Sequence, residues 1–155
     1  MYGRFAPLIE PPAGDASSGE SRYFHVVGGL IWESPEPAVH DWGVHFLGML
    51  GDTPCWAVDV PRGEDPSDGA SLDLFSYFGR VPEIDWLVAG RAVQLVEWAR
   101  SHRFCGRCGT PTHVAPGERA MKCPACNLLA FPRLAPAIIT LVTRCLLYTS
   151  DAADE

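Results

Sequence analysis

Short apolar runs separated by turn residues dominate the region between residues 22 and 60. The runs are Tyr23–Trp32, Gly43–Leu50 and Cys55–Val60. Proline, glycine and acidic residues lie between them, as in Ser34–Pro37 and Gly51–Pro54. Apolar runs of this length bounded by such residues are typical of β-strands. We therefore predict three antiparallel strands in this region.

Residues 1–21 lack this pattern. Proline, glycine and serine residues are spread through the segment and keep its few apolar residues apart. A segment of this composition buries too little apolar surface to offset the entropy lost when it is ordered. We predict a disordered tail that precedes the first strand.

Apolar residues recur at helical spacing between Pro82 and about His102. The periodic positions are Ile84, Leu87, Val88, Ala92, Leu95, Val96 and Ala99. Pro82 suits the first turn of a helix, and Arg100 suits its negative C-terminal end. We predict one long helix that docks on the strands. Further large apolar side chains on this helix are Trp86, Val93 and Trp98. We expect them in the core or a dimer interface rather than as a platform for stacked bases.

Two shorter segments complete the predicted elements. Leu72–Phe78 fits either a strand or a short helix, and we interpret it as a connector. Ala137–Val142 is apolar enough to be buried on both faces, which is typical of a strand inside a covered sheet. We predict a strand there.

Composition narrows the classes of function. The chain has 155 residues, of which 47% are hydrophobic, so it can bury the core of one domain beside a small metal module. Its 19 acidic and 12 basic residues give a formal charge of −7, which argues against broad binding to nucleic acid or anionic membranes. No apolar run is long enough to span a bilayer. No secretory signal is recognisable after Met1, and we expect a cytoplasmic protein.

Four of the six cysteines form the Cys-x-x-Cys pairs Cys105/Cys108 and Cys123/Cys126. Two such pairs at the ends of a short hairpin complete a closed tetrahedral zinc site. Gly109 and Pro124 suit tight turns that direct backbone N–H groups at the sulfur atoms. We predict one structural Zn²⁺ per chain, with a disulfide pair as the weaker alternative. Cys55 lies in an apolar run and is interpreted as a small buried side chain rather than a reactive thiol.

The residues around this metal site form a more specific pattern. A helix end at Glu97–Phe104 leads directly into the first cysteine pair, a Glu-x-Ala-Met segment precedes the second pair, and Phe131–Pro136 reads Phe-Pro-Arg-x-x-Pro. In this order the features resemble the NADH pyrophosphatase (NAD diphosphatase) family of the Nudix superfamily, and Gln94 to Ile139 matches throughout. A four-thiolate site has no open coordination position, so its metal would have a structural role. Any catalytic residues would then lie outside this site.

The resemblance implies an α+β fold. We expect a small antiparallel β-rich N-terminal domain with one long helix at residues 22–103, a zinc ribbon at 104–132, and the first strand of a truncated Nudix domain at 133–144. It further implies a homodimer that hydrolyses the pyrophosphate of NAD(H) to nicotinamide mononucleotide and AMP, with NAD-capped RNA as a second substrate class. No membrane partner is expected.

Two residues outside the cysteine pairs match substrate positions of that family. Glu118 corresponds to a glutamate that family members place at the substrate, and a solvated turn residue is the alternative reading. Phe131 stands where relatives often carry a substrate-contacting tyrosine. A phenylalanine could keep a stacking contact there but lacks the hydroxyl.

The resemblance also shows what these 155 residues lack. Family enzymes hold Mg²⁺ or Mn²⁺ with glutamates of a box of the form Gly-x5-Glu-x7-Arg-Glu-x2-Glu-Glu, and no such box occurs in the sequence. We expect an inactive N-terminal fragment without those metal sites. Cys145–Glu155 departs from the family pattern and resembles the translation of a transposon-end adapter used in sequencing libraries. We interpret it as an artefact and expect the natural sequence to continue beyond Arg144.

A second class of function competes with the enzyme reading. The chain could be a stand-alone zinc-ribbon module that binds nucleic acid or protein. Its ribbon carries only Arg107, Arg119 and Lys122 as cations, and no aromatic residue lies between the cysteine pairs to stack on bases. Salt-dependent binding of single-stranded RNA would favour this module, whereas specific binding of NADH would favour the enzyme.

Overall fold

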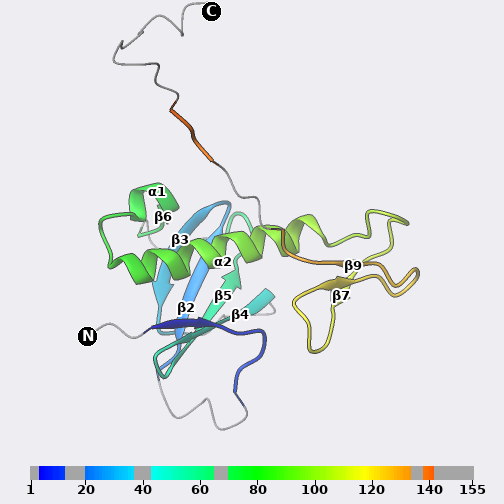
Figure 1. Ribbon diagram of the computed structural model, residues 1–155, viewed down its shortest axis with the longest axis horizontal. Coiled ribbons are helices and arrows are strands. Elements are labelled where there is room, and N and C mark those ends of the chain that lie inside the picture. Colours follow the sequence, from blue (N-terminus) through cyan, green and yellow to red (C-terminus); the bar gives the residue numbers. More distant parts are fainter. Residues whose placement is uncertain (1–3, 13–19, 37–42, 65–69, 134–137, 142–155) are drawn as a thin grey trace, which may run out of the picture.

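A six-stranded sheet and one long helix form the larger part of the computed structural model, which describes residues 4–12, 20–36, 43–64, 70–133 and 138–141. The strands are β1 (Phe5–Pro7), β2 (Arg22–Val27), β3 (Leu30–Ser34), β4 (Gly43–Leu50), β5 (Thr53–Asp59) and β6 (Leu72–Asp73), in the order β1-β4-β5-β2-β3-β6. A short helix, α1 (Leu74–Tyr77), leads to the long helix α2 (Glu83–Ser101), which crosses one face of the sheet (Figure 1). The α+β class is confirmed.

The first apolar run is a hairpin rather than one strand. Gly28 and Gly29 both have positive φ, +53° and +91°, and they form a two-residue turn between β2 and β3. This turn matches the twist of an antiparallel pair and is readily adopted by two glycines. The prediction of a single strand at Tyr23–Trp32 is therefore wrong.

The prediction of an all-antiparallel arrangement is also wrong at one pairing. β2 and β5 run parallel, with Phe24 opposite Ala57 and Val26 opposite Asp59. The other strand pairs of this sheet are antiparallel. β4 and β5 form a hairpin that returns β5 to the side of β2, so the parallel neighbours are not adjacent in sequence.

Part of the expected N-terminal tail is ordered. Phe5–Pro7 forms β1, which pairs with the end of β4, so the prediction of a disordered tail is wrong for these residues. The close approach of β1 to β4 requires a glycine at position 48. A Cβ on Gly48 would lie 2.2 Å from the carbonyl oxygen of Ala6, and Gly48 has a φ of +143°. The ladder between β4 and β5 shifts register between Phe46 and Gly48, which marks a β-bulge at this point.

The core lies between the sheet and α2, as the helical pattern predicted. Val88, Ala92 and Val96 of the helix are fully buried, and they face Phe24 and Leu47 of the sheet within one apolar cluster. Trp98 is buried, while Trp86 and Val93 pack on the edge of the cluster. Cys55 is fully buried in the same cluster, and this burial raises the pKa of its thiol to about 11. Cys55 therefore behaves as an unreactive core side chain.

An ion-pair network fixes the N-terminal end of α2 on the sheet. Arg22 of β2 donates to Glu33 of β3 at 2.5 and 2.7 Å and to Asp85 in the first turn of α2 at 2.6 Å. These hydrogen bonds raise the pKa of Arg22. Because its charge is shared between a strand and a helix N-terminus, Arg22 ties the two layers together.

The ambiguous connector contains both predicted structures. Leu72–Asp73 pairs with β3 as β6, and Asp73 then caps α1 by accepting a hydrogen bond from Ser76 N at 2.9 Å.

Residues 138–141 form no strand, which corrects the prediction for that part of Ala137–Val142. Ile138, Ile139 and Leu141 are 88%, 99% and 85% exposed, and no described strand pairs with them. Their segment stands away from the sheet (Figure 1). The proposed artefact at 145–155 lies outside the described residues.

Candidate metal centre

The two cysteine pairs sit on turns of the same backbone geometry. In the first turn, Cys105 N donates to Thr110 O at 2.8 Å and Gly109 N donates to Cys105 O at 2.8 Å. In the second, Cys123 N donates to Leu128 O at 2.9 Å and Asn127 N donates to Cys123 O at 3.0 Å. Both turns therefore close through bonds at the same relative positions.

The fifth residue of each turn adopts a positive φ. This residue is Gly109 in the first turn, at +72°, and Asn127 in the second, at +56°. Glycine adopts this conformation without steric cost, and asparagine is the other residue that commonly does so. The role of Gly109 agrees with the sequence prediction. Asn127 was missed, although an asparagine directly after a Cys-x-x-Cys pair is the signal that could have identified it.

Two short strands, β7 (His113–Val114) and β8 (Met121–Lys122), lie between the turns, and a third, β9 (Leu129–Ala130), follows the second turn. They form a separate antiparallel sheet in the order β7-β8-β9. β8 runs directly into Cys123, so the hairpin between β7 and β8 brings the second pair back beside the first. This is the ribbon that the cysteine spacing predicted.

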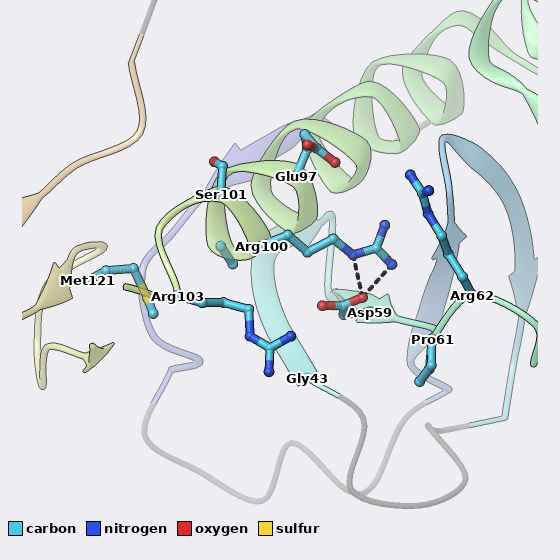
Figure 2. A pocket seen from close by; sticks show the side chains of 10 residues that line it. Gly43, Asp59, Pro61, Arg62, Glu97, Arg100, Ser101, Arg103 and Met121 are labelled. Carbon is cyan, nitrogen blue, oxygen red and sulfur yellow. Dashed lines mark hydrogen bonds and ion pairs between the residues drawn. The ribbon is translucent and has the colours of Figure 1, made fainter. Parts of the chain in front are cut away.

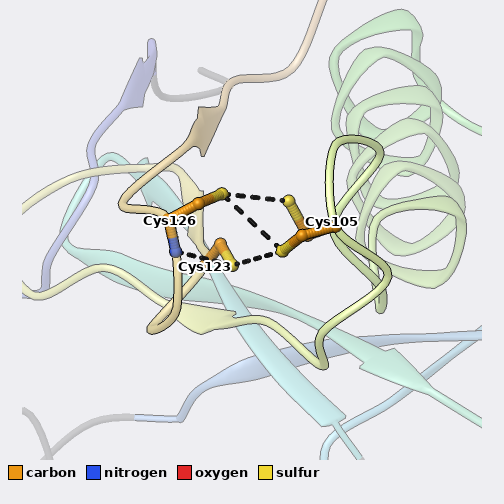
Figure 3. Close-up of side chains that lie close together, drawn as sticks. Cys105, Cys123 and Cys126 are labelled. Atoms are coloured by element: carbon orange, nitrogen blue, oxygen red, sulfur yellow. Dashed lines mark hydrogen bonds between the residues drawn. The ribbon is translucent and has the colours of Figure 1, made fainter.

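The four sulfur atoms converge within 4.8 Å of one another. Cys105 Sγ lies 3.5 Å from Cys126 Sγ, and Cys108 Sγ lies 3.5 Å from Cys123 Sγ and 3.7 Å from Cys126 Sγ. Figure 3 shows Cys105 facing Cys126 across the site, with Cys123 beside them. Zinc–sulfur bonds of about 2.3 Å in a tetrahedral site place the sulfur atoms about 3.8 Å apart. The cluster fits a four-coordinate zinc.

The same distances exclude disulfides within the cluster. A disulfide has an S–S length of about 2.05 Å, much shorter than any of these separations. The five cysteines in the described part of the chain are free thiols. The weaker alternative from the sequence is therefore not seen at these positions.

Hydrogen bonds favour the thiolate form at Cys105 and Cys108, whereas at Cys126 the hydrogen bond from Leu128 is outweighed by burial and the neighbouring thiols, which raise the pKa of Cys126 to about 11. Arg107 N donates to Cys105 Sγ at 3.4 Å, and Cys126 N donates to Cys123 Sγ at 3.5 Å. Thr110 Oγ1 lies 3.3 Å from Cys108 Sγ, and hydrogen bonding from the Thr110 hydroxyl and backbone N–H lowers the pKa of Cys108 to about 6. A thiol with this pKa is largely ionised at neutral pH, which is the state required of a zinc ligand.

The ribbon is attached to the helix and to the sheet. At the helix end, Thr112 Oγ1 donates to His102 O at 2.5 Å and Thr112 N donates to Arg103 O at 3.0 Å. At the sheet, Arg119 donates to Phe46 O at 2.8 Å and also to Leu8 O. Met121 of β8 is buried against the main core. The metal centre therefore sits at a fixed place beside α2.

A groove of about 610 Å³ lies between α2 and the ribbon. Its lining includes Trp98 of the helix, Arg119 of the ribbon and Phe131 after β9. The ring of Phe131 is 51% exposed. Glu118 does not line this groove, because it lies exposed in the turn between β7 and β8. The structure therefore does not bring the two substrate residues of the sequence prediction into one pocket.

A second hollow, of about 760 Å³, lies beside the C-terminal end of α2 (Figure 2). Arg100 points across it to Asp59 Oδ1, with distances of 2.8 Å from Nε and 2.5 Å from Nη2. The same guanidinium donates to Val26 O at 3.2 Å and Val60 O at 2.9 Å. Arg100 is thus neutralised by a carboxylate and fastens the helix to the sheet.

Comparison with known protein families agrees with this arrangement. Residues 31–98 match the model of the NADH pyrophosphatase-like rudimentary NUDIX domain, and residues 100–131 match that of the NADH pyrophosphatase zinc ribbon domain. The chain therefore carries two successive domains of the NADH pyrophosphatase type. The first match covers β3 to β6 and most of α2, and the second covers both cysteine turns.

Curated relatives of this chain are named NAD-capped RNA hydrolase NudC. The protein from Deinococcus radiodurans is 47% identical over 98 residues, which are 63% of this chain and 35% of that protein. The one from Stutzerimonas stutzeri is 56% identical over 98 residues, again 63% of this chain and 36% of the relative. The one from Pseudomonas fluorescens strain Pf0-1 is 53% identical over 100 residues. The chain spans about a third of the length of these relatives.

Proposed function

We propose that residues 22–133 are the N-terminal domain and zinc ribbon of an NAD(H) diphosphatase. The intact enzyme would split the pyrophosphate of NAD(H) into nicotinamide mononucleotide and AMP. NAD-capped RNA, the substrate in the name of the relatives, would be a second substrate. The observation that carries the proposal is the succession of a rudimentary NUDIX domain and its zinc ribbon on one chain.

The metal of the ribbon would serve structure alone. Cys105, Cys108, Cys123 and Cys126 supply four sulfur ligands, which fill the coordination of zinc and leave no position for water or substrate. When bound, zinc would hold the two turns at a fixed distance. The chain's own hydrogen bonds, through Thr112 and Arg119, would then hold the ribbon against the helix and the sheet.

Glu118 and Phe131 are proposed as substrate contacts of the intact enzyme. Phe131 offers an exposed ring on which a nicotinamide or adenine base could stack. Glu118 is exposed, and none of the described residues forms an ion pair or a side-chain hydrogen bond with its carboxylate. Most of the substrate would be held by residues other than those described. Glu118 and Phe131 could therefore contact different parts of the same substrate.

The catalytic step needs groups that the 155 residues do not contain. Cleavage of a pyrophosphate requires neutralisation of the phosphate charges and activation of a water, which Mg²⁺ or Mn²⁺ held by glutamates provides. The glutamate box of Nudix hydrolases does not occur in this sequence. We therefore propose that this chain is inactive by itself and that the intact protein works as a homodimer in the cytoplasm.

The proposal is tested by comparing two proteins. One is the 155-residue chain, and the other is the protein translated from the source gene read beyond the codon of Arg144. With NADH and Mg²⁺ or Mn²⁺, the longer protein should release AMP and nicotinamide mononucleotide, whereas the 155-residue chain should release neither. AMP release by the 155-residue chain, with contaminating hydrolase excluded, would contradict the proposed inactivity. A longer reading frame without the glutamate box would contradict the proposed enzyme.

A further inference from the structure

Two arginines lie side by side in the groove between α2 and the ribbon. Arg91 Nε donates to Leu47 O at 3.2 Å, and Arg119 Nη2 donates to Phe46 O at 2.8 Å. The acceptors are consecutive carbonyl groups of β4, at the bulge where the ladder to β5 shifts register. Leu47 has no partner in the register at this bulge, and hydrogen bonds to the two consecutive carbonyls bring both guanidinium groups to one place.

Neither positive charge is neutralised within the described part of the chain. No described carboxylate oxygen lies within 4.0 Å of Arg91 or Arg119, whereas Arg22 and Arg100 each have an acidic partner. Burial lowers the pKa of both Arg91 and Arg119, and the charge of Arg91 lowers that of Arg119 further. Two half-buried cations that repel each other are unfavourable, and an anion between them would relieve this repulsion.

Hydrogen-bond donors remain for such an anion. A guanidinium carries five N–H donors, and toward the described residues Arg91 donates through Nε alone and Arg119 through Nη2 alone. The groove also contains the exposed Arg133. Glu97 is the acidic residue of the lining; it is exposed and forms no ion pair with these arginines.

We propose that this groove is a binding site for a phosphate oxyanion, held between Arg91 and Arg119. Arginine forks match the oxygen geometry of phosphate and give short charge-assisted hydrogen bonds. The groove, at about 610 Å³, has room for more than a phosphate group, and Phe131 lines it with an exposed ring. The ligand class is therefore a phosphate carried by a nucleotide or by the backbone of a single-stranded nucleic acid.

Phe131 in this groove is also a proposed substrate contact, but phosphate binding by the two arginines can be measured without any diphosphatase activity. It can be measured on the zinc-loaded 155-residue chain with inorganic phosphate as the probe. Titration is followed by NMR through the side-chain Nε–Hε resonances of the arginines. Those of Arg91 and Arg119 should shift in a saturable way, whereas that of the exposed Arg62, outside the groove, should not. Chloride at the same ionic strength serves as the control for screening.

Matched variants assign the site. Arg91→Gln should weaken phosphate binding by about tenfold or more, because it removes one charged donor. Arg62→Gln should leave the affinity within about twofold. Arg119→Lys keeps a charge that can still hold the ribbon, and it should weaken binding through the loss of the planar fork. Zinc content and the unfolding midpoint of each variant show that the fold is retained.

Two further ligands distinguish the sources of the phosphate. If AMP binds as tightly as a 5′-phosphorylated RNA pentamer, the ligand is a small nucleotide. If the RNA binds at least about tenfold more tightly and its affinity falls with salt, the ligand is a nucleic-acid backbone. The proposal is overturned if phosphate shifts Arg91 and Arg119 no more than Arg62, if chloride produces the same shifts, or if Arg91→Gln binds phosphate like the parent chain.

Discussion

Among the described glycines, Gly48 is the one at which an added Cβ atom would have the least space. β1 pairs with β4 at this point, and the φ of Gly48, +143°, lies outside the range that L-residues commonly adopt. Leu47, next to it, is fully buried, and its carbonyl accepts the hydrogen bond from Arg91. A single glycine therefore sets both the pairing of the N-terminal strand and the bulge beneath the groove.

Replacing this glycine should damage the fold. In Gly48→Ala the new methyl group would lie 2.2 Å from Ala6 O, so β1 must move away or the bulge must change shape. We expect a loss of about 2 kcal/mol or more in the free energy of unfolding, measured by urea denaturation. Gly90→Ala is the matched control, because its methyl group would lie 3.6 Å from Leu74 Cδ2 in ordinary contact.

In the control, alanine replaces glycine inside a helix, where it is favoured by roughly 0.5–1 kcal/mol. Gly90→Ala should therefore be neutral or slightly stabilising. If Gly48→Ala were as stable as Gly90→Ala, the close crossing of β1 over β4 would be wrong.

At the scale of elements, the ribbon and the helix–sheet unit are held together in different ways. The helix–sheet unit has a continuous core of buried apolar residues. The ribbon consists of two-residue strands and two cysteine turns, and its buried apolar residues include Ala115, Ala120 and Met121. So small a core cannot maintain the ribbon alone, so its fold should depend on the metal.

Removal of the metal should therefore unfold the ribbon selectively. Zinc binding contributes on the order of 10–16 kcal/mol to the folding of comparable small metal modules. After treatment with a chelator, amides of residues 104–131 should lose their protection from hydrogen exchange, whereas those in the middle of α2 should keep theirs. Mass spectrometry of peptides after deuterium labelling measures both. Equal protection of the ribbon with and without chelator would contradict a metal-dependent fold.

Elements with a strong local pattern were predicted well from the sequence. α2 begins and ends within a residue or two of the predicted limits, because its buried positions repeat with the helical period. The cysteine turns were predicted because spacing alone determines which thiols can meet. The hairpin at Gly28 and Gly29 was missed because the two glycines lie inside a continuous apolar run, where their need for positive φ was not considered.

Features that depend on distant residues could not be predicted in this way. The parallel pairing of β2 with β5 and the strand at Phe5–Pro7 arise from contacts across the sheet and leave no local signal. The pairing of Arg91 with Arg119 likewise requires the ribbon to be placed against α2. Residues 138–141 have an apolar strand sequence, but a strand needs a hydrogen-bonded neighbour, and the described residues provide none.

At the scale of the whole molecule, the chain presents apolar surface that a larger assembly would bury. Ile138, Ile139 and Leu141 are almost fully exposed next to one another. Within the described residues, no helix combines the length and hydrophobicity that crossing a membrane requires. Exposed adjacent apolar side chains of this kind promote association between molecules.

Self-association should therefore depend on this segment. Replacing all three residues by serine should shift the 155-residue chain toward the monomer, as measured by light scattering coupled to size-exclusion chromatography. Phe75→Ser is the control, because Phe75 is 89% exposed but lies on α1, outside this segment. We expect the control to associate like the parent chain. If the triple variant also associated like the parent, residues 138–141 would not be the contact.

The central claim is that four cysteines bind a structural zinc ion and so build a zinc ribbon of the NADH pyrophosphatase type. The most direct test is the metal content of the chain purified without chelator, measured by inductively coupled plasma mass spectrometry. We expect one zinc per chain, its loss in Cys123→Ser, and its full retention in Cys55→Ala, which removes a buried thiol outside the cluster. A parent chain without zinc, or a Cys123→Ser variant with full zinc content, would contradict the claim.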